Sequence, residues 1–254
     1  MSLVHAEYLK ISRRKLYPVM VAILALLVGL TAFFLLIFGQ LAPGLADDVP
    51  VLSKPDAYLI GAQQVAGQTW FPLILAVVLT GAELSTTVWA TTLTRDSRKP
   101  AHIGSRLLVI SVASWVAMLL GTLGWAAVVF FASPGEGGPS ATEWLGVAWK
   151  VGVIQIAWVA LGLGAVAMLR SVGPAIGAVL AFSFGESILA LWGPYQNVSL
   201  SAASAALFQV GLPGDLEAFI PGGDLSLPHA IAIIAGWTLL GLALTWWGLQ
   251  RRDA

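Results

Sequence analysis

Residues 83–106, "ELSTTVWATTLTRDSRKPAHIGSR", separate two long apolar runs and carry four of the thirteen Lys and Arg residues of the chain. Connections between helices in a bundle usually take about 2–8 residues. A basic link of this length is therefore more than a tight turn needs. Two interpretations stand side by side: an ordered helix that docks on a partner at one face of a membrane, or a solvated loop.

The composition around this link is that of a membrane protein. The 254 residues are 58% hydrophobic and 10% charged, whereas a soluble domain is about 25% charged. The mean hydropathy is +0.86. The zero net charge gives no indication of a nucleic-acid partner. The absence of cysteine excludes disulfides, thiolate metal sites and thiol nucleophiles.

Six apolar segments are long enough to cross a bilayer, which takes about 20 helical residues. Backbone groups in lipid must be hydrogen-bonded within the segment, so we expect helices. The sequence predicts an all-α integral membrane protein, with residues 1–254 as a single transmembrane domain. The expected spans are 17–39, 57–81, 107–132, 151–169, 172–192 and 230–250.

The distribution of Lys and Arg predicts the orientation of these spans. If the N-terminus is cytoplasmic, the inner segments hold eleven Lys and Arg and the outer segments hold two. Cytoplasmic loops carry the excess of such residues, so we expect both termini in the cytoplasm. The inner set is Lys10, Arg13, Arg14, Lys15, Arg95, Arg98, Lys99, Arg106, Arg170, Arg251 and Arg252, and the outer set is Lys54 and Lys150.

Two segments outside the spans carry a helical pattern. Residues 3–14 place Leu3, Ala6, Leu9 and Ile11 roughly opposite their charged neighbours. This pattern predicts a basic amphipathic helix at the inner interface, or only a charge cluster that fixes topology. In the outer segment 193–229, we expect two short helices that dip into the outer leaflet or lie on it.

Sequence motifs for catalysis are absent. The chain has no G-x-x-x-x-G-K-[ST] loop, no H-E-x-x-H and no G-x-S-x-G. The three histidines, His5, His102 and His229, are far apart in the sequence. We therefore expect no catalytic residue, no metal site and no cofactor bound by this chain.

A few polar side chains lie within the expected spans. Glu186 is inside the fifth span, and Ser183 is one turn away on the same face. Gln64 and Gln68 are four residues apart in the second span. A charge within a span is costly, so Glu186 should face protein or water. In one interpretation, these four residues line a substrate path or gate. In the other, Glu186 is protonated or bonded to a backbone group, and the two glutamines form hydrogen bonds between helices.

The N-terminal stretch "HAEYLKISRRKLYPVM" resembles the opening of the permease subunits of type-2 ABC exporters, and the basic link resembles their connection between spans two and three. The family usually has Gly-Thr where this chain has Thr87 and Val88, and Lys where it has Arg106. Length and opening are most similar to the small permeases that handle peptide antibiotics such as bacitracin and lantibiotics. The matching positions of the link are Glu83, Thr92, Leu93, Ser97, Arg98 and Arg106.

The resemblance implies that the link contains a coupling helix over residues 84–93, which docks on a separate ATPase subunit. The chain would then be a permease in a bacterial cytoplasmic membrane, paired with a second permease and two ATPases that hold the ATP and Mg²⁺. The apolar spans point to an amphipathic or lipid-like cargo. The residues expected in coupling are Glu83 at the helix start, Leu84, Val88 and Trp89 in the groove, and Arg95 and Arg98 at the other end.

Two other functions fit parts of the same pattern. A membrane scaffold or sensor that anchors a cytosolic partner would use the same basic inner face. An intramembrane enzyme would need Glu186 as its acid–base group, and the sequence offers no second polar partner of matching type.

Overall fold

The computed structural model describes residues 3–41, 54–84, 99–132, 138–208 and 225–251, and all regular structure within these ranges is helical. Six segments are long and apolar enough to cross a membrane, which confirms the prediction of an all-helical multi-pass protein. The helices are α1 Leu3–Arg13, α2 Leu16–Leu41, α3 Lys54–Ala66, α4 Trp70–Leu84, α6 Lys99–Ala132, α7 Ala141–Leu169, α8 Val172–Leu189, α9 Gly193–Gln196, α10 Leu200–Phe208 and α11 Leu227–Gln250.

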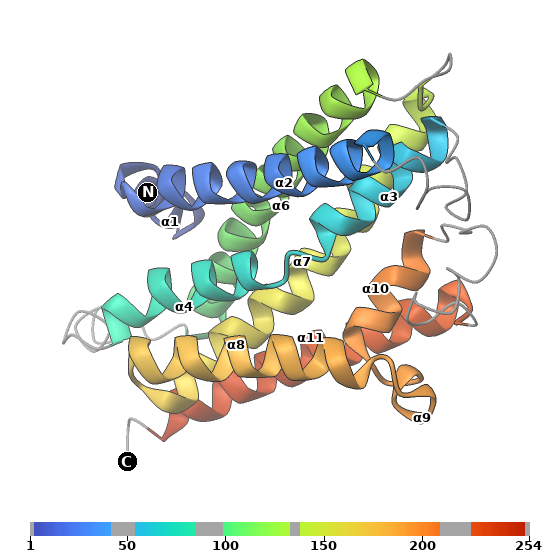
Figure 1. The fold of residues 1–254 in the computed structure, drawn as a ribbon. Helices are drawn as coiled ribbons and strands as arrows, with labels where there is room; N and C mark the ends of the chain where they lie inside the picture. The colour runs from blue at the N-terminus through green and yellow to red at the C-terminus, as the bar shows by residue number, and fades with distance from the viewer. Residues whose placement is uncertain (1–2, 42–53, 85–98, 133–137, 209–224, 252–254) are drawn as a thin grey trace.

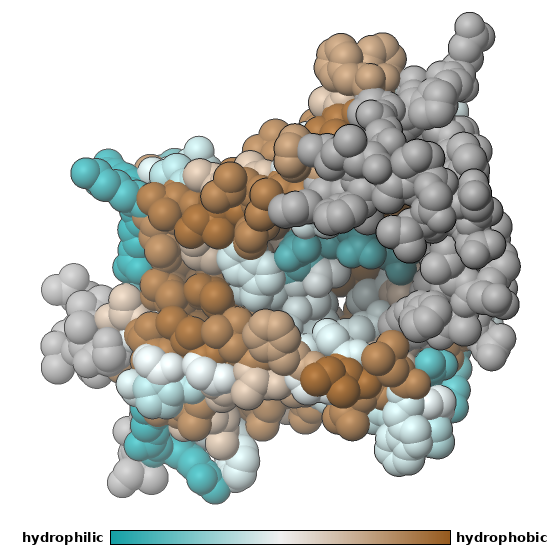
Figure 2. Space-filling view, in the orientation of Figure 1, coloured by the Kyte–Doolittle hydropathy of each residue, from teal (hydrophilic) through white to brown (hydrophobic). Residues whose placement is uncertain are grey.

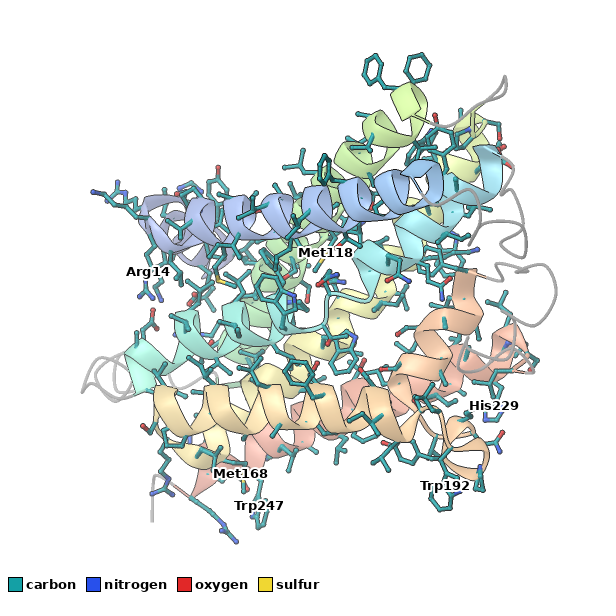
Figure 3. All side chains as sticks on the ribbon, in the orientation of Figure 1. Arg14, Met118, Met168, Trp192, His229 and Trp247 are labelled. Atoms are coloured by element: carbon teal, nitrogen blue, oxygen red, sulfur yellow. The ribbon has the colours of Figure 1, made fainter. Side chains whose placement is uncertain are left out.

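The helices form one bundle, and both ends of the chain lie at the same end of it (Figure 1). This end also holds α1, the last turn of α4 and the turn between α7 and α8, and we refer to it as the terminal end. Arg14 and Trp247 lie there, whereas Trp192 and His229 lie at the opposite end (Figure 3). Six crossings would place the two termini on one side of a membrane, and the cytoplasmic side stays the prediction from the positions of Lys and Arg.

The central helix is α7, which packs against α3, α4, α6, α8, α10 and α11. It begins with a capping box, in which the Ser140 hydroxyl accepts from the Glu143 amide and the Glu143 carboxylate accepts from the Ser140 amide. It ends at Arg170, whose φ of 57° turns the chain sharply into α8. Arg170 also donates to the Arg251 carbonyl (3.1 Å), which joins this turn to the end of α11.

Glycine allows α7 and α11 to approach closely. A Cβ atom on Gly241 would lie 2.5 Å from the Ala160 carbonyl carbon, and one on Gly248 would lie 2.7 Å from the Ala167 carbonyl carbon. Contacts between small residues are the usual way in which membrane helices associate, because lipid provides no hydrophobic force between them. The α7–α11 pair is therefore fixed by backbone contact.

Several span limits differ from the prediction. The third span begins at Lys99 instead of residue 107, and the fourth begins at Ala141 instead of residue 151. Hydropathy marks only the apolar part of a helix, and polar turns at its ends extend beyond that part. Arg106, expected just before the third span, is consequently two turns inside α6.

The second span, predicted as one helix over 57–81, is broken at residues 67–69 into α3 and α4. Pro72 has no amide hydrogen, and its ring would clash with the Gln68 carbonyl if the helix continued. The Thr69 amide instead donates to the Gly67 carbonyl (2.8 Å), and the Phe71 amide donates to the Gln68 carbonyl (3.1 Å). The break follows the start of the span at Ala57 by roughly 15 Å of helix, which places it at membrane depth.

In the outer segment, α9 is a single turn and α10 has nine residues. Most of α10, including Leu200, Leu207 and Phe208, is buried against α3, α7, α8 and α11. The expected first short helix therefore packs into the bundle. The expected second short helix falls on residues 209–224, outside the described ranges.

Candidate functional site

A hollow with polar walls opens beside the break in the second span. We refer to it as the polar hollow. Its volume is about 180 Å³. Figure 2 shows the bundle hollowed on the face between α3–α4 and α8, with paler, less hydrophobic side chains inside brown walls. Its lining comes from α3, the break, α8 and α10: Gln63, Gln64, Ala66, Gly67, Thr69, Ser187, Ser201, Ser204, Ala205 and Phe208.

Glu186 holds together two helices, α8 and α10, that form one wall of the polar hollow. Its side chain is 2% exposed. One carboxylate oxygen accepts from the Ser199 hydroxyl (2.6 Å) and the Ser201 amide (3.0 Å). The other accepts from the Ser201 amide (3.2 Å) and the Ser201 hydroxyl. The carboxylate thus sits at the N-terminus of α10, where unpaired amides and the helix dipole favour negative charge.

Ser199 and Tyr195 complete this arrangement. The Ser199 hydroxyl also accepts from the Ala202 amide (3.0 Å), so it is the N-cap of α10. Partial burial and then the negative charge of Glu186 raise the pKa of Tyr195, which lies in α9 outside the spans. Glu186 therefore ties α8 to the outer segment, which is the structural role that the sequence left open for it.

We expect Glu186→Leu to lower the stability of the protein by about 2–3 kcal/mol, because hydrogen bonds to charged groups contribute roughly 1.5–3 kcal/mol. The α10 amide and the two serine hydroxyls would also be left without their acceptor. Thermal unfolding in detergent, followed by tryptophan fluorescence, measures this change. Ser204→Ala is the control, since among the described residues the Ser204 hydroxyl bonds the Leu200 carbonyl of its own helix. Equal melting temperatures for the two variants would contradict this role.

The other residues predicted to line a substrate path are distributed around the break. Gln64 is exposed and lines the polar hollow. Gln68 lies in the break, where its side-chain oxygen accepts from the Trp70 indole (2.8 Å). Ser183 on α8 is hydrogen-bonded to the Thr69 hydroxyl. The break places Gln64 and Gln68 on different elements, so their spacing of four does not put them on one helical face.

Several residues of the polar hollow were not identified from the sequence. Thr69, Ser187, Ser201 and Ser204 are small hydroxyl residues, which are common on membrane helices. The available signal was the spacing of Ser183 and Ser187 by four, with Pro72 indicating the break. Only the packing of α10 onto α3 and α8 brings these residues together.

A second polar group lies at the terminal end and consists of Glu7, Lys10, Arg14, Glu83 and Arg106. We refer to it as the ionic cluster. Arg106 is 3% exposed and forms ion pairs with Glu83 and with Glu7 (3.4 Å). Lys10 pairs with Glu7 (2.9 Å) and Glu83 (3.0 Å). The ionic cluster thereby joins α1, α4 and α6.

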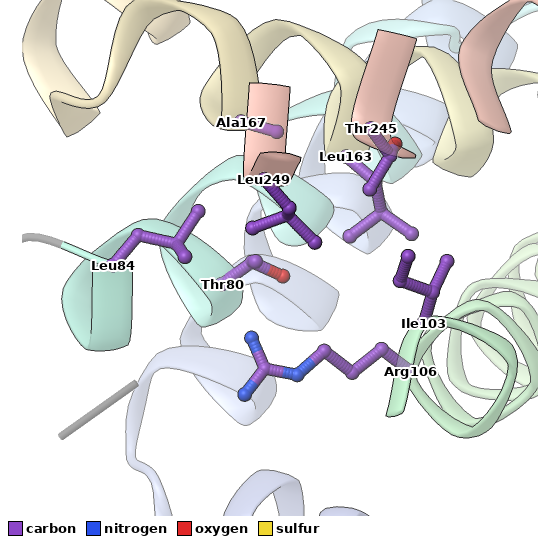
Figure 4. A pocket seen from close by; sticks show the side chains of 8 residues that line it. All are labelled: Thr80, Leu84, Ile103, Arg106, Leu163, Ala167, Thr245 and Leu249. Carbon is purple, nitrogen blue, oxygen red and sulfur yellow. The ribbon is translucent and has the colours of Figure 1, made fainter. Parts of the chain in front are cut away.

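Arg14 and Arg106 extend the ionic cluster along α4. Arg14 lies 4.0 Å from Glu83 and donates to the Leu79 carbonyl (3.5 Å). The Arg106 side chain runs from α6 toward Thr80 and Leu84 (Figure 4). Charges of α1 that were expected to face away from its apolar side therefore point into the bundle, while Val4 and Tyr8 are exposed.

The residues predicted for coupling fall into two groups. Glu83 and Leu84 are buried in the last turn of α4. The dipole of α4 disfavours negative charge at this end, and the surrounding cations offset that cost for Glu83. This differs from the expected place of Glu83 at the start of a helix. Val88, Trp89, Arg95 and Arg98, with the rest of the expected coupling helix, lie outside the described residues.

Metal and catalytic sites were not expected, and the described residues contain no group of three or more His, Asp or Glu side chains that could hold a metal ion. Comparisons of the chain with protein-family models, with curated proteins and with solved structures found no match.

Proposed function

We propose that this chain is the permease subunit of an ATP-driven exporter of the ABC type. It moves an amphipathic or lipid-like cargo across a bacterial cytoplasmic membrane, with both termini in the cytoplasm. It pairs with a second permease, identical or homologous, and with two copies of a separate ATPase that binds ATP and Mg²⁺. The chain itself is not an enzyme.

The observation that carries this proposal is the break in the second span beside the polar hollow. Irregular backbone at membrane depth is tolerated where it is buried in protein or lines a cavity. In many transporters the substrate site is built from such discontinuous helices. A bundle serving only as an anchor needs neither a broken span nor polar walls within the membrane.

The ionic cluster supports a path from the partner to the polar hollow. Residues 85–98 follow Leu84, the neighbour of Glu83, and precede α6, which carries Arg106. Because Glu83 and Arg106 are paired, a force on this link acts on α4 and α6 together. The other end of α4 is the break at the polar hollow. When the two ATPases close on ATP, the side of the membrane from which the cavity is accessible would change. The size of this shift is set by the difference in ATP affinity between the two access states.

Co-purification tests this proposal. In mild detergent, the chain from its native membrane should carry an ATPase subunit, identified by mass spectrometry, and the complex should hydrolyse ATP. Val88→Asp should remove the ATPase from the complex, since loss of an interface anchor costs about 2 kcal/mol or more. Ser12→Asp is the control, because Ser12 is an exposed residue of α1 at the same end.

Two outcomes would contradict the proposal. A Val88→Asp complex that kept its ATPase and full cargo-stimulated hydrolysis would show that the link is only a solvated connection. A stable cytosolic partner without ATPase activity would favour the scaffold or sensor, for which the ionic cluster offers a firm cytoplasmic face.

A further inference from the structure

We propose that the polar hollow, extended by Gln155 and Trp158 of α7, binds an uncharged hydrogen-bonding group of an amphipathic molecule. The claim that this molecule is the cargo rests on the proposed function. The claim that the polar hollow is a binding site rests on the geometry alone.

Gln155 is fully buried, and neither its amide oxygen nor its amide nitrogen has a hydrogen-bond partner among the described residues. A buried amide without partners costs about 1–3 kcal/mol, judging from mutational data on proteins. Natural proteins rarely retain such a group without a reason. A buried amide without a partner among the described residues can bond a polar group that reaches it.

The register of α7 places Gln155 at the break. Gly162 packs on Leu73 and Ala76 of α4, where its Cβ would lie 2.8 Å from the Ala76 Cβ. Gln155 is seven residues earlier on nearly the same face of α7, about 10.5 Å farther from the terminal end. Because α4 and α7 both run toward that end (Figure 1), the level seven residues before Leu73 and Ala76 is residues 66–69.

Trp158 adds a donor on the same face of α7, one turn from Gln155. Its side chain is fully buried, and its indole nitrogen also has no partner among the described residues. Its ring lies 6.2 Å from the ring of Phe182 on α8, whose neighbour Ser183 bonds Thr69 in the wall of the polar hollow. Neither residue lines the polar hollow directly, so we place both behind its floor, where they would add two donors and one acceptor to a bound group.

The chemistry of these walls favours an uncharged group. Among the described residues that line the polar hollow, the polar side chains are amides and hydroxyls, without Lys, Arg, Asp or Glu. Glu186 lies behind Ser201 and is already held by α10. The Lys150 ammonium lies 5.7 Å from the centre of the Phe208 ring and is engaged in this cation–π contact. A charged headgroup would therefore lose its hydration in the polar hollow without gaining an opposite charge from the residues that line it. A neutral polyol or amide headgroup exchanges its water for several donors and acceptors.

Cysteine protection tests the assignment, because the chain has no native cysteine. Ser187→Cys places a single thiol in the polar hollow, in nanodiscs of phosphatidylcholine. Its reaction with N-ethylmaleimide is followed with three amphiphiles of equal chain length: neutral monolauroylglycerol, cationic dodecyltrimethylammonium and anionic laurate. Ser171→Cys, at the exposed turn before α8, is the control position.

At a concentration of about four times its Kd, monolauroylglycerol should slow the reaction of Ser187→Cys about fivefold. The reason is that a bound ligand lowers the reaction rate by the factor 1 + [L]/Kd. The two charged amphiphiles should leave the rate unchanged, as should all three at Ser171→Cys. Adding Gln155→Leu should remove the protection without lowering the melting temperature, because the amide has no partner to lose.

Equal slowing by all three amphiphiles, or by none, would overturn the assignment. Protection that survives Gln155→Leu would overturn the role of Gln155, and so would a fall in melting temperature, which would reveal a structural amide. The assay contains neither ATP nor ATPase. Failure of ATP-driven transport therefore leaves this result standing, and failure here leaves the ATPase partnership untouched.

Discussion

Gly241→Ala should destabilise the bundle by about 1–3 kcal/mol, the usual cost of forcing one extra group into a packed core. The added Cβ would lie 2.5 Å from the carbonyl carbon of Ala160, 2.6 Å from its oxygen and 2.7 Å from the Leu161 nitrogen. These are backbone atoms of the central helix, so no side chain can rotate away. Helices α7 and α11 must move apart along their contact.

Gly236→Ala on the same helix is the matched control, because its Cβ would meet nothing within 4 Å. Replacing Gly by Ala inside a helix normally stabilises it by about 0.5–1 kcal/mol. The two variants should therefore shift the melting temperature in opposite directions. Gly241→Leu should prevent recovery of a monodisperse protein by size-exclusion chromatography. A rise in melting temperature for Gly241→Ala would disprove the close contact of α7 and α11.

Glu83→Leu should cost about 3–5 kcal/mol, as removal of one partner from a buried ion pair typically does. Arg106 is 3% exposed, and the substitution takes away its pair with the α4 carboxylate while Lys10 and Arg14 remain nearby. Within the ionic cluster, Lys10 and Arg106 would keep their ion pairs with Glu7, and Arg14 would lose its pair with Glu83. We expect a large fall in melting temperature and a loosened α1.

Lys10→Gln is the control for this variant, because the Lys10 side chain is 39% exposed. Exposed ion pairs contribute about 0–1 kcal/mol, so the change in melting temperature should be small. The double variant Glu83→Leu with Arg106→Leu should recover much of the loss, since it removes both charges. A double-mutant cycle without coupling between the two sites would contradict a buried pair.

The helical spans could be predicted from hydropathy because each must bury its backbone polar groups within itself. That requirement is local, so six spans and an even number of crossings are visible in the sequence. Their ends were less well predicted, as at Lys99 and Ala141, because polar helical turns carry no hydropathy signal. The break at residues 67–69 has a local cause in Pro72, which was overlooked within an apolar run.

The polar residues illustrate the limit of sequence reasoning. Glu186 was identified by the cost of a charge in a span. Its partners Ser199 and Ser201 are 13 and 15 residues away and were not identified. The expected pairing of Gln64 with Gln68 assumed a continuous helix, and the break separated them. Arg106 and Glu83 were noted as parts of a link, although they pair deep between α4 and α6.

The sequence by itself determined that the chain is helical and has six segments long and apolar enough to cross a membrane, because hydropathy and backbone hydrogen bonding act along a single segment. The tertiary structure decided which polar groups meet. The buried amide of Gln155, the backbone contact at Gly241 and the polar hollow each depend on the rotation and depth of helices distant in the sequence. Those quantities are set by packing between helices, where lipid gives no hydrophobic preference and close fit decides.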